Sequence, residues 1–84
     1  SMAYMAPECI GGQPSQASDQ YSLAITYHEL RTGALPFDAD RPMAVLEAHR
    51  KGRLHLDRLR PLERRVIQIA TAVNPNKRFA ISVS

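Results

Sequence analysis

The chain contains 84 residues, which is room for one small domain, and 44% of them are hydrophobic, an ordinary share for a folded protein. Its single cysteine, Cys9, excludes an internal disulfide and provides no metal-binding pattern. The sequence has no apolar run of about eighteen residues and no charged-then-apolar leader at its start. We therefore expect no membrane span in this segment and a cytoplasmic location. Ser1 and Met2 are interpreted as a tag or cloning remnant.

The net charge of +3 is unevenly distributed along the chain. Residues 1–40 carry one arginine and five carboxylates, whereas residues 41–65 carry eight lysines and arginines and three carboxylates. Such a basic segment either attracts nucleic acid or an acidic partner, or forms solvated helix ends and loops. No aromatic residue is interleaved with these charges to stack on bases, so nucleic acid is not the expected partner.

The first predicted elements are a short turn and a long helix. Pro7 favours a helical turn over residues 7–10, and the residues 11–14 that follow, with two glycines and a proline, break it. Ser15 or Ser18 can cap a helix predicted at about 17–32, which Gly33 ends. Apolar residues lie on nearly every side of this helix. It is therefore predicted to be the core helix, surrounded by other elements.

Two further helices are predicted in the second half of the chain. The first covers residues 42–51, with Asp40 as its cap, Gly52 at its end, and Met43, Val45 and Leu46 toward the core. An irregular stretch at residues 53–60 contributes three leucines. Pro61 then opens a helix to about residue 73, and its apolar residues repeat with the helical period: Leu62, Val66, Ile69, Ala70 and Val73.

These elements define an all-α fold class, with three main helices and short turns in one subdomain, residues 3–84. The last residues, 79–84, are too few to assign and are interpreted as the start of a further element.

Four short motifs follow one another along this succession of helices. They are Ala6-Pro7-Glu8, Ser18-Asp19-Gln20-Tyr21-Ser22-Leu23, Glu29-Leu30-Arg31-Thr32-Gly33 with Pro36-Phe37, and Asn74-Pro75-Asn76-Lys77-Arg78-Phe79. In this order and spacing they resemble the C-terminal lobe of a serine/threonine protein kinase, from the end of the activation segment through the late helices. The residues of these motifs resemble those of bacterial eukaryotic-like kinases. The resemblance implies a parent protein that transfers the γ-phosphate of ATP to protein serine and threonine hydroxyls.

The resemblance also implies roles for individual residues. Glu8 and Arg78 match a glutamate and an arginine that form an ion pair beneath the activation segment, for which a bidentate guanidinium–carboxylate geometry is well suited. Asp19 matches the aspartate that anchors the catalytic loop on the core helix. Tyr4 and Met5 match the loop that receives the substrate, so they are candidates for a substrate platform.

Leu23, Thr26 and Leu30 define a face of the core helix that other parts of a kinase lobe would cover. Because this chain does not contain those parts, we expect the face to be exposed. Exposed apolar faces drive association, so we also expect the chain to self-associate through it. Three positions depart from the family pattern: Thr26, where a large apolar residue is usual, Ala24, where glycine is common, and Asn74, where aspartate is usual.

The sequence lacks the motifs that carry phosphoryl transfer. It has no Gly-x-Gly-x-x-Gly, no His-Arg-Asp and no Asp-Phe-Gly. We therefore expect no catalytic, cofactor-binding or metal-binding residue in this chain, with ATP and Mg²⁺ implied for the parent alone. The expected partners are a protein substrate or the remainder of the kinase. Two alternatives stay open, a stand-alone kinase-derived interaction module and a basic nucleic-acid binder.

Overall fold

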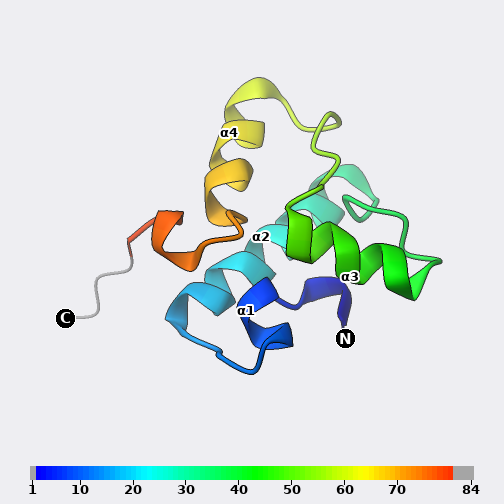
Figure 1. Cartoon of the computed structure of the whole chain (residues 1–84). Helices are drawn as coiled ribbons and strands as arrows, with labels where there is room; N and C mark the ends of the chain where they lie inside the picture. Colours follow the sequence, from blue (N-terminus) through cyan, green and yellow to red (C-terminus); the bar gives the residue numbers. More distant parts are fainter. Residues whose placement is uncertain (1, 81–84) are drawn as a thin grey trace.

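A computed structural model describes residues 2–80, and every regular element in that range is helical (Figure 1). The all-α prediction with three main helices is confirmed. Ser1 and residues 81–84, including most of the further element expected at the end of the chain, lie outside the described residues. With η denoting a 3-10 helix, the order is η1 (Met2–Tyr4), α1 (Pro7–Ile10), α2 (Gln16–Thr32), α3 (Pro42–Lys51), α4 (Pro61–Ala70) and η2 (Pro75–Lys77).

The long helix α2 has a defined signal at each end. Ser15 is its extended N-cap residue, and the Ser15 backbone N–H donates to the Ser18 hydroxyl oxygen at 2.9 Å. At the other end Gly33 adopts a left-handed conformation (φ 79°), and its N–H donates to the Glu29 carbonyl. A residue with a β-carbon is strained in this conformation, which explains why glycine ends the helix.

The helix α3 occupies the expected residues, but two details of that expectation were wrong. Arg41, not Asp40, is the N-cap residue, because Pro42 takes the first helical position and Asp40 lies one residue too early. Met43 is 75% exposed, whereas Val45, Ala48 and His49 are buried. These buried residues form one stripe along the helix, and Met43 lies on the other side of it.

The helix α4 ends at Ala70, three residues earlier than expected. Pro75 has no N–H to donate to the Thr71 carbonyl, so the helix cannot continue to this residue, and the chain turns instead. The apolar face that the helical period defines is only partly buried. Leu62 and Val66 are 78% and 45% exposed, while Ile67 and Ala70 are buried against α2, so the true contact face is rotated from the predicted one.

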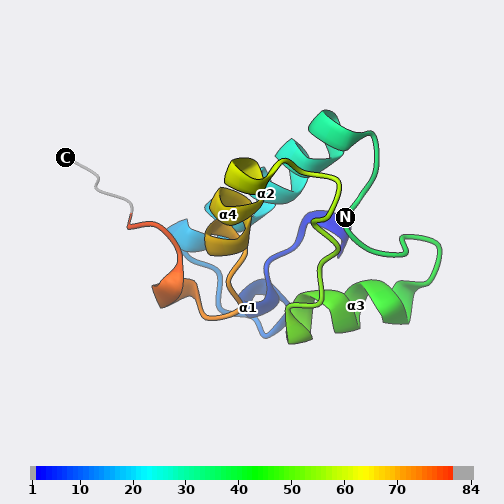
Figure 2. The same ribbon diagram turned by 90° about the horizontal axis from the view of Figure 1, so that it is seen from above.

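The core lies around α2. One cluster of buried residues joins α2 and α4 through Ala24, Ile67 and Ala70, and it includes Leu56 and Leu59 from the irregular stretch. Figures 1 and 2 show α4 on one side of α2 and the N-terminal segment with α3 on the other. The described residues extend 37 × 30 × 18 Å. The short axis is less than two helix diameters, so α2 is not covered on all sides.

Candidate functional site: the Arg78 anchor

Glu8 and Arg78 come from opposite ends of the described chain and meet beside α2. Glu8 lies in the first turn of α1, which Pro7 opens. Arg78 follows η2, whose start is fixed by the Asn74 side chain, since the Asn74 carbonyl oxygen accepts from the Asn76 N–H at 2.9 Å. An amide oxygen thus caps this turn where the family usually has aspartate.

The two side chains form a buried, bidentate ion pair. The Arg78 Nη1 donates to Glu8 Oε2 at 2.6 Å, and Nη2 donates to Oε1 at 2.8 Å. The Arg78 side chain is fully buried and that of Glu8 is 11% exposed. The planar guanidinium matches the carboxylate with two parallel bonds, which fixes their relative orientation.

Glu8 stays ionised in this environment. Partial burial acts to raise its pKa, but the hydrogen bonds from Arg78 and Ser18 outweigh that effect and lower the pKa of Glu8 to about 2. The Ser18 hydroxyl donates to Glu8 Oε2 at 2.7 Å. Ser18 is thus both part of the capping arrangement of α2 and a ligand of the carboxylate.

Arg78 also donates to the backbone of two further segments. Its Nε donates to the Ala72 carbonyl at 2.8 Å, and Nη1 donates to the Ala17 carbonyl at 2.9 Å. The guanidinium carbon lies 4.9 Å from the centre of the Tyr21 ring, a cation–π distance. One side chain therefore connects α1, the start of α2 and the segment after α4. We call Arg78, Glu8, Ser18 and Tyr21 the Arg78 anchor.

Several contacts at this anchor were missed from sequence. The Gln20 side chain donates to the Phe79 carbonyl at 2.9 Å and accepts from the Phe79 N–H at 3.0 Å, which pins the backbone after Arg78 to α2. The sequence predicts that Ser15 or Ser18 caps α2. No local signal indicates that the same Ser18 hydroxyl reaches Glu8, because that contact depends on the tertiary fold.

Tyr4 and Met5, the expected platform residues, lie at the start of the same N-terminal segment and are half-buried. The Tyr4 hydroxyl donates to Glu29 at 2.5 Å, and the Tyr4 carbonyl accepts from the Ser22 hydroxyl at 2.6 Å. The hydrogen bond to Glu29, with a smaller contribution from burial, raises the pKa of Tyr4. Residues 4–8 are therefore attached to α2 at both ends.

A second polar contact sits deeper in the core. The Tyr21 hydroxyl and Nδ1 of His49 share a hydrogen bond of 2.6 Å, and both side chains are fully buried. The His49 ring packs edge-on against Phe37, with ring centres 5.0 Å apart. Burial lowers the pKa of His49, although backbone hydrogen bonds with Met2 and Ala3 oppose the shift. No pattern in the sequence predicts this pair.

The remaining predicted residues are not brought together with the anchor. The side chain of Asp19 is exposed and makes no hydrogen bond within residues 2–80. Leu23 and Leu30 are 70% and 82% exposed on α2. Thr26 is half-buried, and its hydroxyl donates to the Ser22 carbonyl at 2.9 Å within the same helix.

The described residues do not assemble a metal or membrane site. Within residues 2–80 no group of three or more histidine, cysteine, aspartate or glutamate side chains could hold a metal ion. No helix in that range is long and apolar enough to cross a bilayer. The arrangement holds a segment of backbone in place, and its polar atoms are engaged in doing so.

No family model matches the sequence. The chain is 38% identical over 82 residues to the serine/threonine-protein kinase PksC of Streptomyces coelicolor, an alignment that covers 90% of this chain and 15% of that protein. It is 36% identical over 83 residues to the serine/threonine-protein kinase PknB of Mycolicibacterium smegmatis, covering 90% of this chain and 13% of the relative.

The fold has a counterpart among solved structures. A crystal structure of the Rad53 kinase domain with SCD2, in complex with AMPPNP, superposes with a TM-score of 0.79 and 26% identity, over 94% of this chain and 34% of that one. Sequence and fold point to the same class of protein. The chain is homologous to the C-terminal region of serine/threonine protein kinases, and its fold is that of part of the kinase C-terminal lobe.

Proposed function

We propose that this chain works within a serine/threonine protein kinase as a structural and substrate-platform subdomain. The Arg78 anchor is the observation that carries the proposal. It ties the Ala6-Pro7-Glu8 segment to α2 through a buried ion pair, at the positions that the kinase resemblance indicates. The complete protein would transfer the γ-phosphate of ATP to serine and threonine hydroxyls of a protein substrate.

Positioning is the contribution that this subdomain would make. Phosphoryl transfer depends mostly on holding the acceptor hydroxyl in place, and residues 4–8 are fixed at Tyr4 and at Glu8. We propose that Tyr4 and Met5 contact the substrate from this rigid segment. The exposed carboxylate of Asp19 would accept hydrogen bonds from the catalytic loop of the complete lobe.

The residues of this chain do not fit ATP or Mg²⁺. The four glycines do not form a phosphate-binding loop, and the described residues offer no cluster of carboxylates for a divalent cation. No residue here is therefore assigned a step of the chemistry. We propose that the protein is located in the cytoplasm, where ATP and protein substrates are both present.

The test is phosphotransfer by the complete gene product, given radiolabelled ATP, Mg²⁺ and a generic protein substrate. We expect label on serine or threonine, and a loss of about tenfold or more in Arg78→Lys, which cannot keep both bonds to Glu8. Glu47→Gln, a change on the exposed side of α3, is the control and should keep full activity. Absence of label would contradict the kinase proposal. Full activity of Arg78→Lys would contradict the role of the anchor.

A second proposal concerns the exposed face of α2. Leu23, Tyr27 and Leu30 recur at helical spacing and are at least 41% exposed, and the apolar groove beside them is completed by Leu62 and Val66 of α4. We propose that two copies of this chain associate through this face.

Sedimentation equilibrium tests this association. The 84-residue chain should show a mass that rises with concentration, and Leu30→Lys should reduce it to that of a monomer. Met43→Lys places the same charge at a comparably exposed site on α3 and should leave association unchanged. A monomer at every concentration, or equal behaviour of the two variants, would contradict the proposed face.

A further inference from the structure

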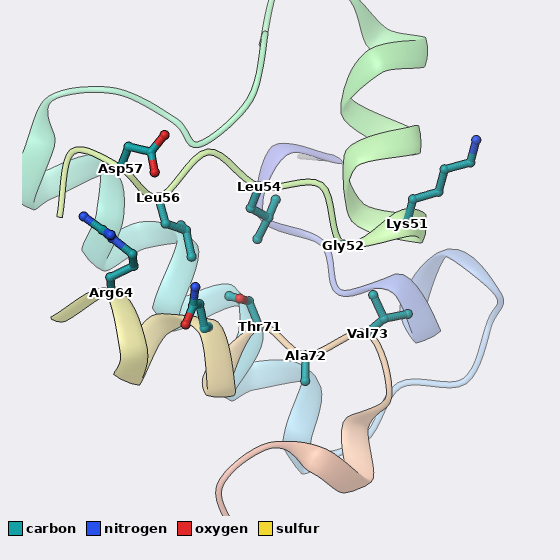
Figure 3. A pocket seen from close by; sticks show the side chains of 10 residues that line it. Lys51, Gly52, Leu54, Leu56, Asp57, Arg64, Thr71, Ala72 and Val73 are labelled. Atoms are coloured by element: carbon teal, nitrogen blue, oxygen red, sulfur yellow. The ribbon is translucent and has the colours of Figure 1, made fainter. Parts of the chain in front are cut away.

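A cavity separate from the Arg78 anchor opens between α3 and α4. It measures about 370 Å³ and lies between the last turn of α3, the irregular stretch at residues 53–60 and the second half of α4 (Figure 3). This volume is within the range of small-ligand and peptide side-chain pockets. Leu54, Leu56 and Val73 supply apolar walls, and Asp57, Arg64 and Gln68 supply polar groups. We call it the α3–α4 pocket.

The backbone around Gly52 shapes one wall of this pocket. Gly52 is left-handed (φ 66°) at the end of α3, and a β-carbon there would lie 2.9 Å from Cγ2 of Val73. Only glycine both adopts this conformation without strain and leaves room for Val73. The chain can therefore turn sharply from α3 into the stretch that carries Leu54 and Leu56.

A donor and an acceptor lie at the opposite end of the pocket. Figure 3 shows Asp57, on the irregular stretch, and Arg64, on α4, near each other at this end. Arg64 Nη2 donates to the Leu59 carbonyl at 3.1 Å, but its Nε is buried without a hydrogen-bond partner within residues 2–80. No ion pair joins Arg64 to Asp57 in that range. The half-buried Arg64 side chain therefore keeps hydrogen-bond donors that residues 2–80 do not use.

A peptide backbone carries both a hydrogen-bond acceptor for Arg64 and a hydrogen-bond donor for Asp57. Its carbonyl can accept from Arg64, its N–H can donate to Asp57, and the exposed amide of Gln68 can do either. A neighbouring apolar side chain of the same peptide can enter the space between Leu54, Leu56 and Val73. Few other ligand classes combine a paired acceptor and donor with an apolar branch.

The charge around the pocket selects among peptides. Residues 50–65, which form much of the wall, carry seven lysines and arginines and two carboxylates. Glu63 is paired with Arg31, and Lys51 and Arg53 are both paired with Glu47, which leaves five arginines and one carboxylate in this segment. Acidic residues on either side of the inserted side chain would therefore be attracted.

We propose that the α3–α4 pocket binds an extended peptide segment in which one apolar residue is flanked by acidic residues. This site is separate from the platform proposed for Tyr4 and Met5. It would recruit a protein partner whatever activity the complete protein has.

Fluorescence anisotropy of a fluorescein-labelled peptide, Glu-Glu-Leu-Glu-Glu, with the 84-residue chain tests this proposal. We expect saturable binding, and amide NMR shifts concentrated at the residues that line the pocket. The same peptide with serine in place of leucine should bind about tenfold more weakly or worse, since it leaves the apolar walls unfilled. Equal binding of the two peptides would mean charge attraction alone and would overturn the proposal.

Two variants locate the binding in the pocket. Arg64→Gln should weaken binding about tenfold, whereas Arg65→Gln, which removes the same charge from the next and exposed position, should change it less than twofold. Gln68→Trp changes an exposed residue and fills the cavity, so it should abolish binding while the circular dichroism melt of the chain is unchanged. Equal losses in Arg64→Gln and Arg65→Gln would overturn the proposal. The proposal would also be overturned if the peptide still bound to Gln68→Trp and a single-stranded oligonucleotide displaced it from both this variant and the parent chain.

Discussion

The two ends of α2 each meet an arginine–glutamate pair, yet the pairs differ in almost every physical respect. At the first end Arg78 and Glu8 are 0% and 11% exposed and share two hydrogen bonds. At the other end Arg31 and Glu63 are 48% and 22% exposed and share one contact of 2.9 Å. The Tyr27 hydroxyl also donates to Glu63. The same residue types thus form a buried connection at one end and a surface contact at the other.

The difference shows that burial and the number of partners decide what an ion pair contributes. Water screens the exposed pair, and its side chains lose conformational freedom when they are held together. The buried pair is shielded, and removal of one partner leaves a charge that water cannot reach. Arg78 also holds the carbonyls of Ala17 and Ala72, so its loss would release three segments of backbone at once.

The largest effect is expected from Arg78→Ala. Glu8 would keep only its bond from Ser18, and the carbonyls of Ala17 and Ala72 would lose their donor. Breaking one side of a buried pair costs about 3–5 kcal/mol of unfolding free energy. For a domain of this size that is enough to unfold much of the population. Urea unfolding followed by circular dichroism measures it, and a loss below about 1 kcal/mol would contradict the buried connection.

The next largest effect is a dependence of stability on pH through Glu8. Its pKa falls from an ordinary 4.5 to about 2 in the folded chain. A lowered folded-state pKa gives stability that is complete above about pH 4.5 and is lost as the pH falls toward 2. The loss should be about 3 kcal/mol, since each unit of pKa shift corresponds to about 1.4 kcal/mol. In Glu8→Gln the unfolding free energy should be lower at neutral pH, and it should change less with pH across this window. An unchanged slope would show that other groups cause the acid sensitivity.

A smaller effect is expected from Tyr21→Phe. The change removes the hydroxyl that shares a hydrogen bond with His49 Nδ1 and leaves that buried nitrogen without this partner. The cost should be about 1–3 kcal/mol, because the ring keeps its packing and its position under Arg78. The thermal midpoint measures it, with Tyr27→Phe as the matched change at an exposed tyrosine. Equal midpoints for both variants would mean that the buried hydrogen bond contributes nothing.

The smallest effect is expected at the exposed pair. Arg31→Gln should leave the urea midpoint within experimental error of the parent chain, since both side chains remain solvated. Added salt should likewise have little effect on this variant relative to the parent. A loss at Arg31→Gln as large as that at Arg78→Ala would remove the contrast between the two ends of α2.

The sequence predicted the helices better than it predicted their orientation. Proline and glycine act locally, so α2 and α3 begin and end within one residue of the expected positions. Which side of a helix is buried depends on its neighbours. Leu62 and Met43 fit an apolar pattern but lie where nothing in the described chain covers them. Periodicity alone could not distinguish these residues from Ile67 or Val45.

The contacts of the candidate site also fall into a predicted and an unpredicted group. Glu8 and Arg78 are 70 residues apart, and only the family resemblance connected them in advance. The contributions of Ser18 and Gln20 arise because their side chains happen to face these segments in the folded chain. Contacts of this kind carry no local signature. They depend on the tertiary fold, so only the structure shows them.

A double-mutant cycle on Glu8 and Arg78 tests the central claim most directly. The unfolding free energies of the parent chain, Glu8→Gln, Arg78→Gln and the double variant give the coupling between the two side chains. The same cycle on Arg31 and Glu63 is the internal reference. We predict a coupling of about 2 kcal/mol or more at the buried pair, clearly above that of the reference pair. A coupling of zero at Glu8 and Arg78, or one no larger than at the exposed pair, would contradict the account.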